Sequence, residues 1–547
     1  MKTIVTSALP YSYSMPHLGN FTGSVLPADV YFKYLMMRGE DAIFICGSDQ
    51  HGTPIELKAI KEKLEPEALA DLIHGQIKDA FHDFGCTFTH YGKTHSEANR
   101  RVVGQFFDAL NANKYIVEQA STQPYCANDR RFLTDRLIEG TCPYCKSNEA
   151  RGDQCNNCGK LLTPSQIIDP HCNICGKSDI TFKTVKNLAI ALDKLQSGIK
   201  KFITSESKND WTKNAVNKSL SYVDEGLKPR DITRHMKWGF PVPLKGFEDA
   251  VFYVWFDAIL GYIGITKEWD EKRCDEYWKD ADTRIVHFMG KDNIEFHTLM
   301  WPGVLLGSNL GYRMPTTIRA SEYLTSKQVK FSKSKGVGLT IDKALEIMGP
   351  DYWRFVLMYI YPETADSEFT IDLFVEVVNK IMNGKVGNLV NRVLTIAASN
   401  KALITKSNPG KYEAEVEKMT KRYLEHFDRF GLREALHDLV ALADYGNELM
   451  STTEPWKLAK IAAESKDAAS EFSSIMNALI DIIYKLGIML HPFAPSASTA
   501  ATSYFGITGQ PHIRMFGTPH EINYSMEIKP IFGKITDAQI EMLEKYT

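Results

Sequence analysis

Pro16-His17-Leu18-Gly19-Asn20 stands between two segments of different periodicity near the start of the chain. The apolar run at residues 3–9 predicts a β-strand, and the large apolar residues of 18–38 recur at the spacing of an α-helix. His17 is therefore expected at a helix N-terminus, where backbone N–H groups and the helix dipole favour phosphate. Gly19 has no side chain, so a nucleobase or ribose can approach its backbone closely. This strand-to-helix unit predicts half of a nucleotide-binding site.

A second run, Lys330-Phe331-Ser332-Lys333-Ser334-Lys335-Gly336, lies in the middle of the chain. Three lysines among serines and a glycine are typical of a loop that closes on polyphosphate. Taken alone, either run is more often ordinary: His-Leu-Gly is common, and Lys-Ser loops occur as solvated basic patches. Their order, separation and strand-to-helix setting indicate that the two runs form one nucleoside triphosphate site.

Length and composition indicate a globular protein of three or four domains, with 547 residues of which 44% are hydrophobic. The net charge of −3 argues against a broadly basic protein, but RNA binding needs only local basic stripes. No apolar stretch is expected to span a membrane, because residues 251–266 contain Asp257 and residues 475–490 contain Asp481 and Lys485. The start of the chain lacks a secretory apolar segment, so we expect a cytoplasmic protein.

Seven of the ten cysteines lie between residues 126 and 175. Cys142-x2-Cys145 and Cys155-x2-Cys158 have the spacing of tetrahedral thiolate coordination, and a disulfide framework is improbable in a cytosolic chain. We predict one Zn²⁺ bound by these four cysteines. Because four closed ligands leave no position for water, the metal is expected to be structural.

The remaining pair, Cys172-x2-Cys175, needs partners from elsewhere in the chain. Cys126-x2-Asp129 repeats the two-residue gap with a carboxylate in the last place, and zinc accepts carboxylate ligands. His171 is a rival ligand, and an ordinary surface position is the alternative for either residue. A second zinc site is therefore possible.

The two signature runs resemble those of the class I aminoacyl-tRNA synthetases, which read His-Ile-Gly-His and Lys-Met-Ser-Lys-Ser. Here Asn20 replaces the final histidine and Phe331 replaces the methionine. Asparagine can donate a hydrogen bond but carries no charge. We therefore expect His17 and the lysines, rather than Asn20, to provide the electrostatic stabilisation in catalysis. The resemblance implies that ATP, with Mg²⁺, activates an amino acid that is then transferred to tRNA.

Within that class, the cysteine-rich insertion resembles the two-knuckle connective insertion of methionyl-tRNA synthetases. Relatives that select branched aliphatic amino acids carry a larger editing domain there, and nothing in this insertion resembles one. The resemblance implies an α/β protein: a Rossmann-type nucleotide-binding catalytic domain (residues 1–113 and 227–325) with an inserted zinc-knuckle domain (114–226), a lysine-loop and stem-contact segment (326–382) and a C-terminal α-helical anticodon-binding bundle (383–547).

The ends of the predicted strands supply candidates for amino-acid binding. Residues 42–47 predict a second strand that ends just before Asp49, so Leu9, Tyr11 and Asp49 are expected to converge at the carboxyl edge of a parallel sheet. Asp49 could pair with the substrate ammonium group, with a helix-capping role as the alternative. The aromatic run at residues 251–262 suits a thioether sulfur, although such runs are often plain core. The resemblance implies a methionine site formed by Leu9, Tyr11, Asp49, Trp255, Ala258, Tyr262, Phe296 and His297.

The resemblance also assigns residues to ATP. Gly290 and Asp292 follow a predicted strand at residues 285–289 and match positions near the ribose and phosphates, and Arg234 matches an active-site arginine. The implied ATP-binding set is His17, Gly19, Asn20, Arg234, Gly290, Asp292, Lys330, Ser332 and Lys333. Of these, His17, Lys330 and Lys333 are the implied catalytic residues, which stabilise the departing diphosphate.

From residue 383 onward the apolar pattern is helical. Asn388 and Arg392 are four residues apart and share a helix face, and Trp456 follows Pro455 at a predicted helix start, where its ring could stack on an exposed base. A polar surface pair and a packed tryptophan are the alternatives, but all three residues match anticodon-contact positions of the resembled family. No appended dimerisation or general tRNA-binding module is recognisable, so we expect a monomer, with a separate tRNA-binding partner protein as a possibility.

Two rival functions remain at this point. One is a class I ligase for another amino acid such as cysteine, which an ATP–pyrophosphate exchange assay would separate. The other is a catalytically silent, zinc-containing RNA-binding or scaffold protein, which the presence of His17, Asp49, Lys330 and Lys333 argues against.

Overall fold

The computed structural model contains a five-stranded parallel sheet with the strand order β14-β13-β1-β2-β3. Its strands are β1 Lys2–Ser7, β2 Asp41–Ser48, β3 His90–Lys93, β13 Arg284–Gly290 and β14 Thr317–Ser321. The structure describes residues 1–133, 137–152, 155–158, 160, 162–326, 338–405, 412–462 and 464–546, and the backbone of 329–330.

Helices cover both faces of this sheet, so its central strands β1, β2 and β13 are buried on both sides, as is typical of parallel sheets. Successive residues of β1 point to opposite faces: Ile4 joins the core beneath α5, α8 and α10, whereas Val5 joins the core beneath α2 and α4. Gly264 lets α8 approach α5 closely, because a Cβ there would lie 2.7 Å from the Cα of Asn99. These helices are α2 Leu26–Arg38, α4 Pro66–Asp83, α5 Glu97–Ala112, α8 Val254–Trp269 and α10 Trp301–Ser308.

The first strand-to-helix unit forms as predicted, with two differences in detail. β1 ends at Ser7 rather than residue 9, shortly before Pro10, which has no N–H for the ladder. The predicted helix at residues 18–38 is α1 Leu18–Asn20 and α2 separated by a π-helical turn, η1 Phe21–Val25. His17 is the N-cap of α1, as expected.

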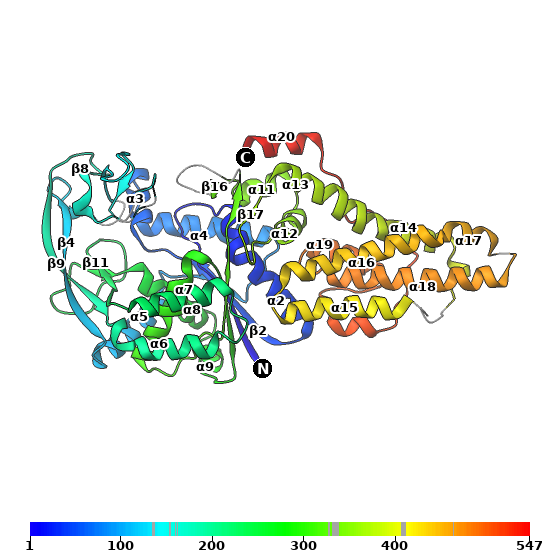
Figure 1. Cartoon of the computed structure of the whole chain (residues 1–547), viewed down its shortest axis with the longest axis horizontal. Helices are drawn as coiled ribbons and strands as arrows, with labels where there is room; N and C mark the ends of the chain where they lie inside the picture. The colour runs from blue at the N-terminus through cyan, green and yellow to red at the C-terminus, as the bar shows by residue number, and fades with distance from the viewer. Residues whose placement is uncertain are drawn as a thin grey trace.

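The insertion is built on a long antiparallel pair of strands, β4 Ile116–Cys126 and β9 Ile180–Ile190, which lies at the left edge of Figure 1. Between these strands the chain forms a small sheet of β6 Ile138–Thr141, β7 Ala150–Arg151 and β8 Ile168–Cys172. Helices α6 Leu192–Glu206 and α7 Lys213–Glu225 then return to the core on the α10 side of the main sheet.

The segment after β14 begins with strand β15 Leu324–Ser326, which pairs with β16 Val329–Lys330 and with β17 Ser367–Glu368. Helices α11 Ile341–Ile347, α12 Pro350–Tyr359 and α13 Ile371–Glu376 follow. A long π-helical stretch, η7 Val377–Gly387, continues directly into the helical bundle. This segment therefore joins the catalytic sheet to the bundle.

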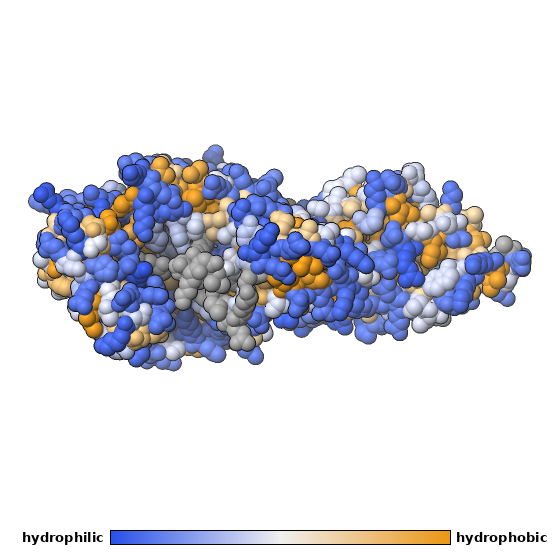
Figure 2. Space-filling model, turned by 90° about the horizontal axis from the view of Figure 1, so that it is seen from above, coloured by the Kyte–Doolittle hydropathy of each residue, from blue (hydrophilic) through white to orange (hydrophobic). Residues whose placement is uncertain are grey.

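The C-terminal bundle extends to the right in Figure 1, and Figure 2 shows it as a narrower lobe beside the broader catalytic lobe. Its helices are α14 Asn388–Ser399, α15 Glu413–Asp428, α16 Leu432–Thr453, α17 Pro455–Ile461, α18 Lys466–Met489 and α19 Pro495–Ser503, and α20 Asp537–Tyr546 returns to pack on α11 and α13. By length and composition α18 could cross a membrane, but 89% of its most apolar window is buried among the other helices. It has the environment of a bundle core helix.

A buried ionic cluster holds the bundle to the catalytic domain. Asp29 of α2 accepts hydrogen bonds from Lys33 at 2.6 and 2.7 Å and pairs with Arg354 of α12 at 2.7 Å. Arg354 is fully buried and also donates to the carbonyl groups of Pro492 and Phe493 in the bundle. Each of these buried charges has ionic or hydrogen-bond partners, which offset the free-energy cost of removing an isolated charge from water.

Candidate active site and metal centres

A cavity of about 430 Å³ opens at the carboxyl ends of β1 and β13. In the sheet, β2 and β3 follow β1 on one side, whereas β13 and β14 lie on its other side. The strand order therefore reverses at β1, and parallel sheets bind ligands at such a switch point. All eight residues predicted for methionine and five of those predicted for ATP line this one cavity: Leu9, Tyr11, Asp49, Trp255, Ala258, Tyr262, Phe296, His297, His17, Gly19, Asn20, Gly290 and Asp292.

His17 is fixed by the start of α1. Its Nδ1 accepts the backbone N–H of Asn20 at 3.0 Å, and the amide oxygen of Asn20 accepts the backbone N–H of His17 at 3.4 Å. With Nδ1 acting as an acceptor, the proton of the neutral ring lies on Nε2. Asn20, which departs from the class signature, thus completes a reciprocal helix cap.

Described residues on both sides of the lysine run lie beside this cavity. Backbone hydrogen bonds join Leu18 N–H to the Leu339 carbonyl at 2.9 Å and Ile341 N–H to the Pro16 carbonyl at 3.0 Å. On the other side, β16 pairs with β15, whose Leu324 lines the cavity. The segment that follows the lysine run is therefore a neighbour of the first signature run. Ser332, Lys333 and the side chain of Lys330 lie outside the described residues.

One end of the cavity is aromatic. Trp255 and Phe296 stack in parallel with ring centroids 3.7 Å apart, and Tyr11 meets the edge of Trp255 at 6.4 Å. Trp255, Ala258 and Tyr262 recur at helical spacing, so they share one face of α8. Such a surface suits an apolar, polarisable thioether side chain.

Tyr262 and His297 add a defined polar contact to this end. The Tyr262 hydroxyl lies 2.9 Å from His297 Nε2, and His297 Nδ1 lies 2.9 Å from the Asn293 carbonyl. A carbonyl can only accept, so Nδ1 carries the proton and the tyrosine hydroxyl donates to Nε2. Burial lowers the pKa of His297 to about 4, which keeps the ring neutral near pH 7.

Asp49 is the buried carboxylate of the cavity, with 3% of its surface exposed. Burial, and then the negative charge of Asp257, raises the pKa of Asp49 well above its usual range. Among the described residues, its carboxylate accepts a single hydrogen bond, from the backbone N–H of His51 at 3.3 Å. A cation bound beside Asp49 would therefore strongly stabilise its ionised carboxylate.

Gly290 and Asp292 form the opposite wall, after β13. A Cβ at Gly290 would meet no atom within 4 Å, so a ligand has room to approach that backbone. Asp292 accepts a hydrogen bond from the Tyr323 hydroxyl, which also lines the cavity. Arg234, by contrast, is not among the lining residues: it pairs with Asp231 at 2.7 Å and lies 4.1 Å above the ring of Tyr253.

Several lining residues were not predicted. Those of the β14 edge are Ser321, Glu322, Tyr323 and Leu324, and Tyr13, Asn293 and Ile259 lie between predicted positions. Ligands gather at the carboxyl ends of parallel strands, so a strand predicted at residues 317–321 would have indicated Ser321 to Leu324 as lining residues. The sequence analysis predicts no strand there. The Ser321 hydroxyl donates to the carbonyl of Gly23 in η1 at 2.8 Å, which fixes the π-helical turn against this edge.

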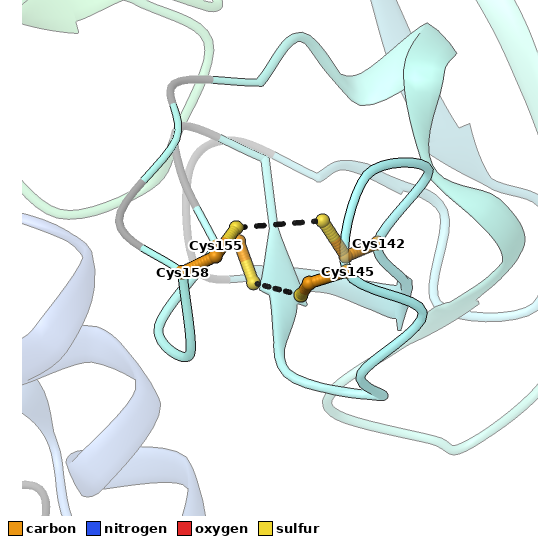
Figure 3. Close-up of side chains that lie close together, drawn as sticks. All are labelled: Cys142, Cys145, Cys155 and Cys158. Carbon is orange, nitrogen blue, oxygen red and sulfur yellow. Dashed lines mark hydrogen bonds between the residues drawn. The ribbon is translucent and has the colours of Figure 1, made fainter.

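The cysteines of the insertion form two candidate metal centres among the described residues. Sulfur atoms of Cys142 and Cys158 lie 3.9 Å apart, and those of Cys145 and Cys155 lie 3.7 Å apart, as Figure 3 shows. A tetrahedron with metal–sulfur bonds of about 2.3 Å has edges of about 3.8 Å. The geometry of this group therefore fits one tetrahedral metal ion.

The second group contains Cys126, Asp129, Cys172 and Cys175, whose ligand atoms lie within 4.8 Å of one another. Cys126 and Cys175 sulfurs are 3.7 Å apart, and Cys172 Sγ is 3.1 Å from Asp129 Oδ2. His171 is not part of the group and instead lies 4.0 Å from Glu139. The structure thus favours Asp129 over His171 as the fourth ligand.

In the bundle, the structure brings two of the three predicted anticodon residues together. The Arg392 guanidinium of α14 lies 5.4 Å from the ring centroid of Trp456 in α17. Asn388 lies one turn before Arg392 on α14 and is exposed. The arrangement offers a flat ring and a cation on one surface, which is a suitable platform for a nucleobase.

Comparisons with known proteins agree with this geometry. The family model described as "tRNA synthetases class I (M)" matches residues 3–394, and that described as "Anticodon binding domain of methionyl tRNA ligase" matches residues 405–545. The methionine–tRNA ligase of Pyrobaculum islandicum is 40% identical over 555 residues, covering 100% of this chain and 96% of the relative. That of Ignicoccus hospitalis is 38% identical over 556 residues, covering 100% and 97%.

Solved structures support the fold. The chain is similar to Mycobacterium tuberculosis methionyl-tRNA synthetase in complex with methionyl-adenylate, with a TM-score of 0.80 and 21% identity, covering 97% of this chain and 100% of that chain. The predicted class I α/β architecture with an inserted domain and a helical bundle is thereby confirmed. Because a family model spans residues 3–394 and relatives align along the whole chain, the chain belongs to the methionyl-tRNA synthetases, the class I methionine–tRNA ligases.

Proposed function

We propose that the cavity binds methionine and ATP side by side, and that its own residues position them for the first step of the family reaction. As a methionine–tRNA ligase, the chain joins L-methionine to its tRNA in an ATP-dependent reaction through methionyl-adenylate. The observation that carries the residue assignment is the convergence of the methionine and ATP candidates on one cavity at the sheet switch point.

In the first step, an oxygen of the methionine carboxylate attacks the α-phosphorus of ATP. A carbon–oxygen–phosphorus linkage forms while the bond to the β-phosphate breaks, and diphosphate leaves. His17 is assigned to the phosphates through Nε2–H, supported by its fixed tautomer and its place at a helix N-terminus. Lys330 and Lys333 are assigned from the sequence to neutralise the leaving diphosphate, with Ser332 as a further contact and Mg²⁺ accompanying ATP.

Methionine is assigned to the aromatic end of the cavity. Asp49 would pair with its ammonium group, and the stacked Trp255 and Phe296 would contact the thioether. Leu9, Tyr11 and Ala258 complete the wall. In the second step, a terminal ribose hydroxyl of the tRNA attacks the methionyl carbonyl carbon, and AMP leaves.

Both cysteine groups are assigned to Zn²⁺. Thiolate ligands at tetrahedral spacing favour zinc, and the second group adds the carboxylate of Asp129. Each group has four ligands drawn from separate turns or strand ends of the insertion, so the metal would stabilise the fold of the insertion. We assign the contact with the tRNA anticodon to Asn388, Arg392 and Trp456. We further propose that the enzyme acts as a monomer and that a separate tRNA-binding protein can associate with it.

Replacing His17 by alanine tests the phosphate assignment. Loss of one donor to developing charge should slow adenylate formation by about 100-fold or more, with methionine affinity changed by less than about threefold. Single-turnover kinetics gives the rate, and titration of the intrinsic tryptophan fluorescence with methionine gives the affinity. His82→Ala, a change on the exposed surface of α4, serves as the control. Equal losses of rate and methionine affinity in His17→Ala would contradict the assignment.

A further inference from the structure

The aromatic end of the cavity is contacted by an arginine that does not itself line the cavity. Arg230 lies in strand β10 Arg230–Asp231, which pairs with β9 of the insertion through Ile190. Its side chain donates to the Glu295 carboxylate at 3.0 Å, and its guanidinium lies over the ring of Phe296, 5.7 Å from the ring centroid. One arginine therefore contacts two consecutive residues, of which Phe296 lines the cavity and Glu295 does not.

These two residues stand at the start of the π-helical turn η5 Phe296–Met300. Glu295 is the N-cap of η5, but its side chain makes no cap hydrogen bond and pairs with Arg230 instead. Phe296 is 7% exposed and stacks on Trp255, with the two rings 4° from parallel. The contacts of Arg230 are therefore made to a residue of the stacked aromatic wall and to its immediate neighbour.

Both contacts are of kinds that favour one side-chain arrangement. A guanidinium over an aromatic ring is attracted by the negative charge of the ring face. The planar guanidinium also loses little conformational freedom for each hydrogen bond that it forms. Asp231, the other residue of β10, pairs with Arg234 at 2.7 Å and so has its own partner. Since half of the Arg230 side chain is exposed, each contact alone is expected to be modest.

We propose that Arg230 is a positioning residue for methionine: its ion pair with Glu295 and its place over the Phe296 ring hold Phe296 against Trp255, in the arrangement that contacts the methionine side chain. This inference rests on the proposed assignment of the aromatic end of the cavity to methionine. The effect of Arg230 passes through Phe296. His17, the phosphate candidate, belongs to another element, the start of α1, so loss of Arg230 should weaken methionine binding and leave ATP binding unchanged.

The test uses Arg230→Met, which keeps an unbranched side chain and removes the charge. In ATP–pyrophosphate exchange, the methionine KM should rise about fivefold or more, with kcat and the ATP KM within about twofold of wild type. Arg230→Lys keeps a cation that can pair with Glu295 and lie over Phe296, so its methionine KM should stay within about twofold of wild type. A lysine variant as impaired as Arg230→Met would contradict the role of the cation.

A double variant tests whether the effect passes through Phe296. Phe296→Leu alone should raise the methionine KM, because the stacked wall is lost. Adding Arg230→Met to Phe296→Leu should raise it by less than about twofold further, since substitutions of two residues in contact are not additive when one acts through the other. If the two single effects instead multiply in full, the inference is overturned.

Arg100→Met is the matched control. It removes an exposed arginine of α5 that pairs with Glu97 at 2.8 Å, and because neither residue lines the cavity, its kinetic constants should equal those of wild type. Thermal unfolding checks that each variant folds. A methionine KM unchanged in Arg230→Met, or a rise shared equally by methionine and ATP, would overturn the inference. An unchanged methionine KM in Phe296→Leu, or no methionine-dependent exchange in the wild-type enzyme, would instead contradict the proposed function on which the inference rests.

Discussion

Asp49 shows how burial can make one carboxylate selective. A charge on a side chain as buried as that of Asp49 is costly, and the cost is relieved by a cation that fits beside it. The neutral Tyr262–His297 pair lies in the same cavity and offers no competing charge. Under the proposed assignment, Asp49 takes the ammonium group of methionine and the aromatic end of the cavity takes its apolar side chain.

The pH dependence of methionine binding follows from the pKa of Asp49. That pKa is raised in the free enzyme, so the carboxylate form is present above it and is lost as the pH falls through it. The methionine ammonium stays protonated over that range, so the methionine KM should rise as the pH falls. Asp49→Asn should have a high KM at every pH and should lack the acid limb. KM measured by exchange across the acid and neutral range checks this, and an identical acid limb in Asp49→Asn would refute the role.

Most of the residues that line the cavity could be predicted from the sequence. The ends of the predicted strands and the family resemblance both indicate a site at the carboxyl edge of the parallel sheet. Leu9, Tyr11 and Asp49 follow two predicted strands and meet in the cavity. The contribution of Tyr323 was not predicted, since it depends on strand β14, whose five residues are too short a run for polar–apolar alternation to stand out. The pairing of Arg230 with Glu295 joins residues far apart in the chain, and no local pattern indicates it.

At the scale of elements, the site depends on two departures from regular helix. The π-helical turns η1 and η5 Phe296–Met300 both border the cavity, and π-turns are frequent at functional sites. Hydrophobic periodicity predicts the helices but does not reveal these turns, because one extra residue in a turn hardly changes the apolar pattern. The insertion is the opposite case, since the spacing of its cysteines indicates the metal ligands directly.

Two metal ions per chain are expected from the two ligand groups. Cys155→Ser should lower the zinc content from about two to about one per chain and lower the unfolding temperature of the insertion, because a structural metal contributes directly to folding. Elemental analysis by mass spectrometry measures the content. Cys274→Ala removes a buried thiol outside both groups and should retain both ions.

The fourth ligand of the second group can be tested in the same way. Asp129→Ala should lose one zinc ion, whereas His171→Ala should keep both, because His171 lies outside the ligand cluster. The reverse result would return His171 to the ligand set.

At the scale of the whole molecule, the cavity and the Arg392–Trp456 pair lie on different lobes, and Figure 1 shows α14 and α17, which carry this pair, away from the parallel sheet. The buried cluster of Asp29, Lys33 and Arg354 joins the helix that follows His17 to the bundle. A single Asp within an apolar helix gives no sign of a partner 325 residues away, so this contact could not be predicted from the sequence. The helical character of the bundle could be predicted from the sequence, because its apolar residues recur at regular helical spacing.

Separate lobes predict separable activities. Trp456→Ala should lower kcat/KM for tRNA in aminoacylation by about tenfold or more, the scale of one lost base stack, and should leave ATP–pyrophosphate exchange within about twofold. The matched control is Trp269→Ala, which removes another tryptophan beneath an arginine, Arg273, on the catalytic lobe. Loss of exchange together with aminoacylation in Trp456→Ala would indicate a folding defect rather than a tRNA contact.

ATP–pyrophosphate exchange with each of the twenty standard amino acids would show whether this cavity activates methionine with ATP. We predict exchange that depends on L-methionine, with kcat/KM for every other standard amino acid lower by about 100-fold or more, because the aromatic wall and Asp49 together fit a thioether amino acid. Preferred activation of another amino acid, or no exchange with methionine by a folded, metal-loaded enzyme, would contradict the account.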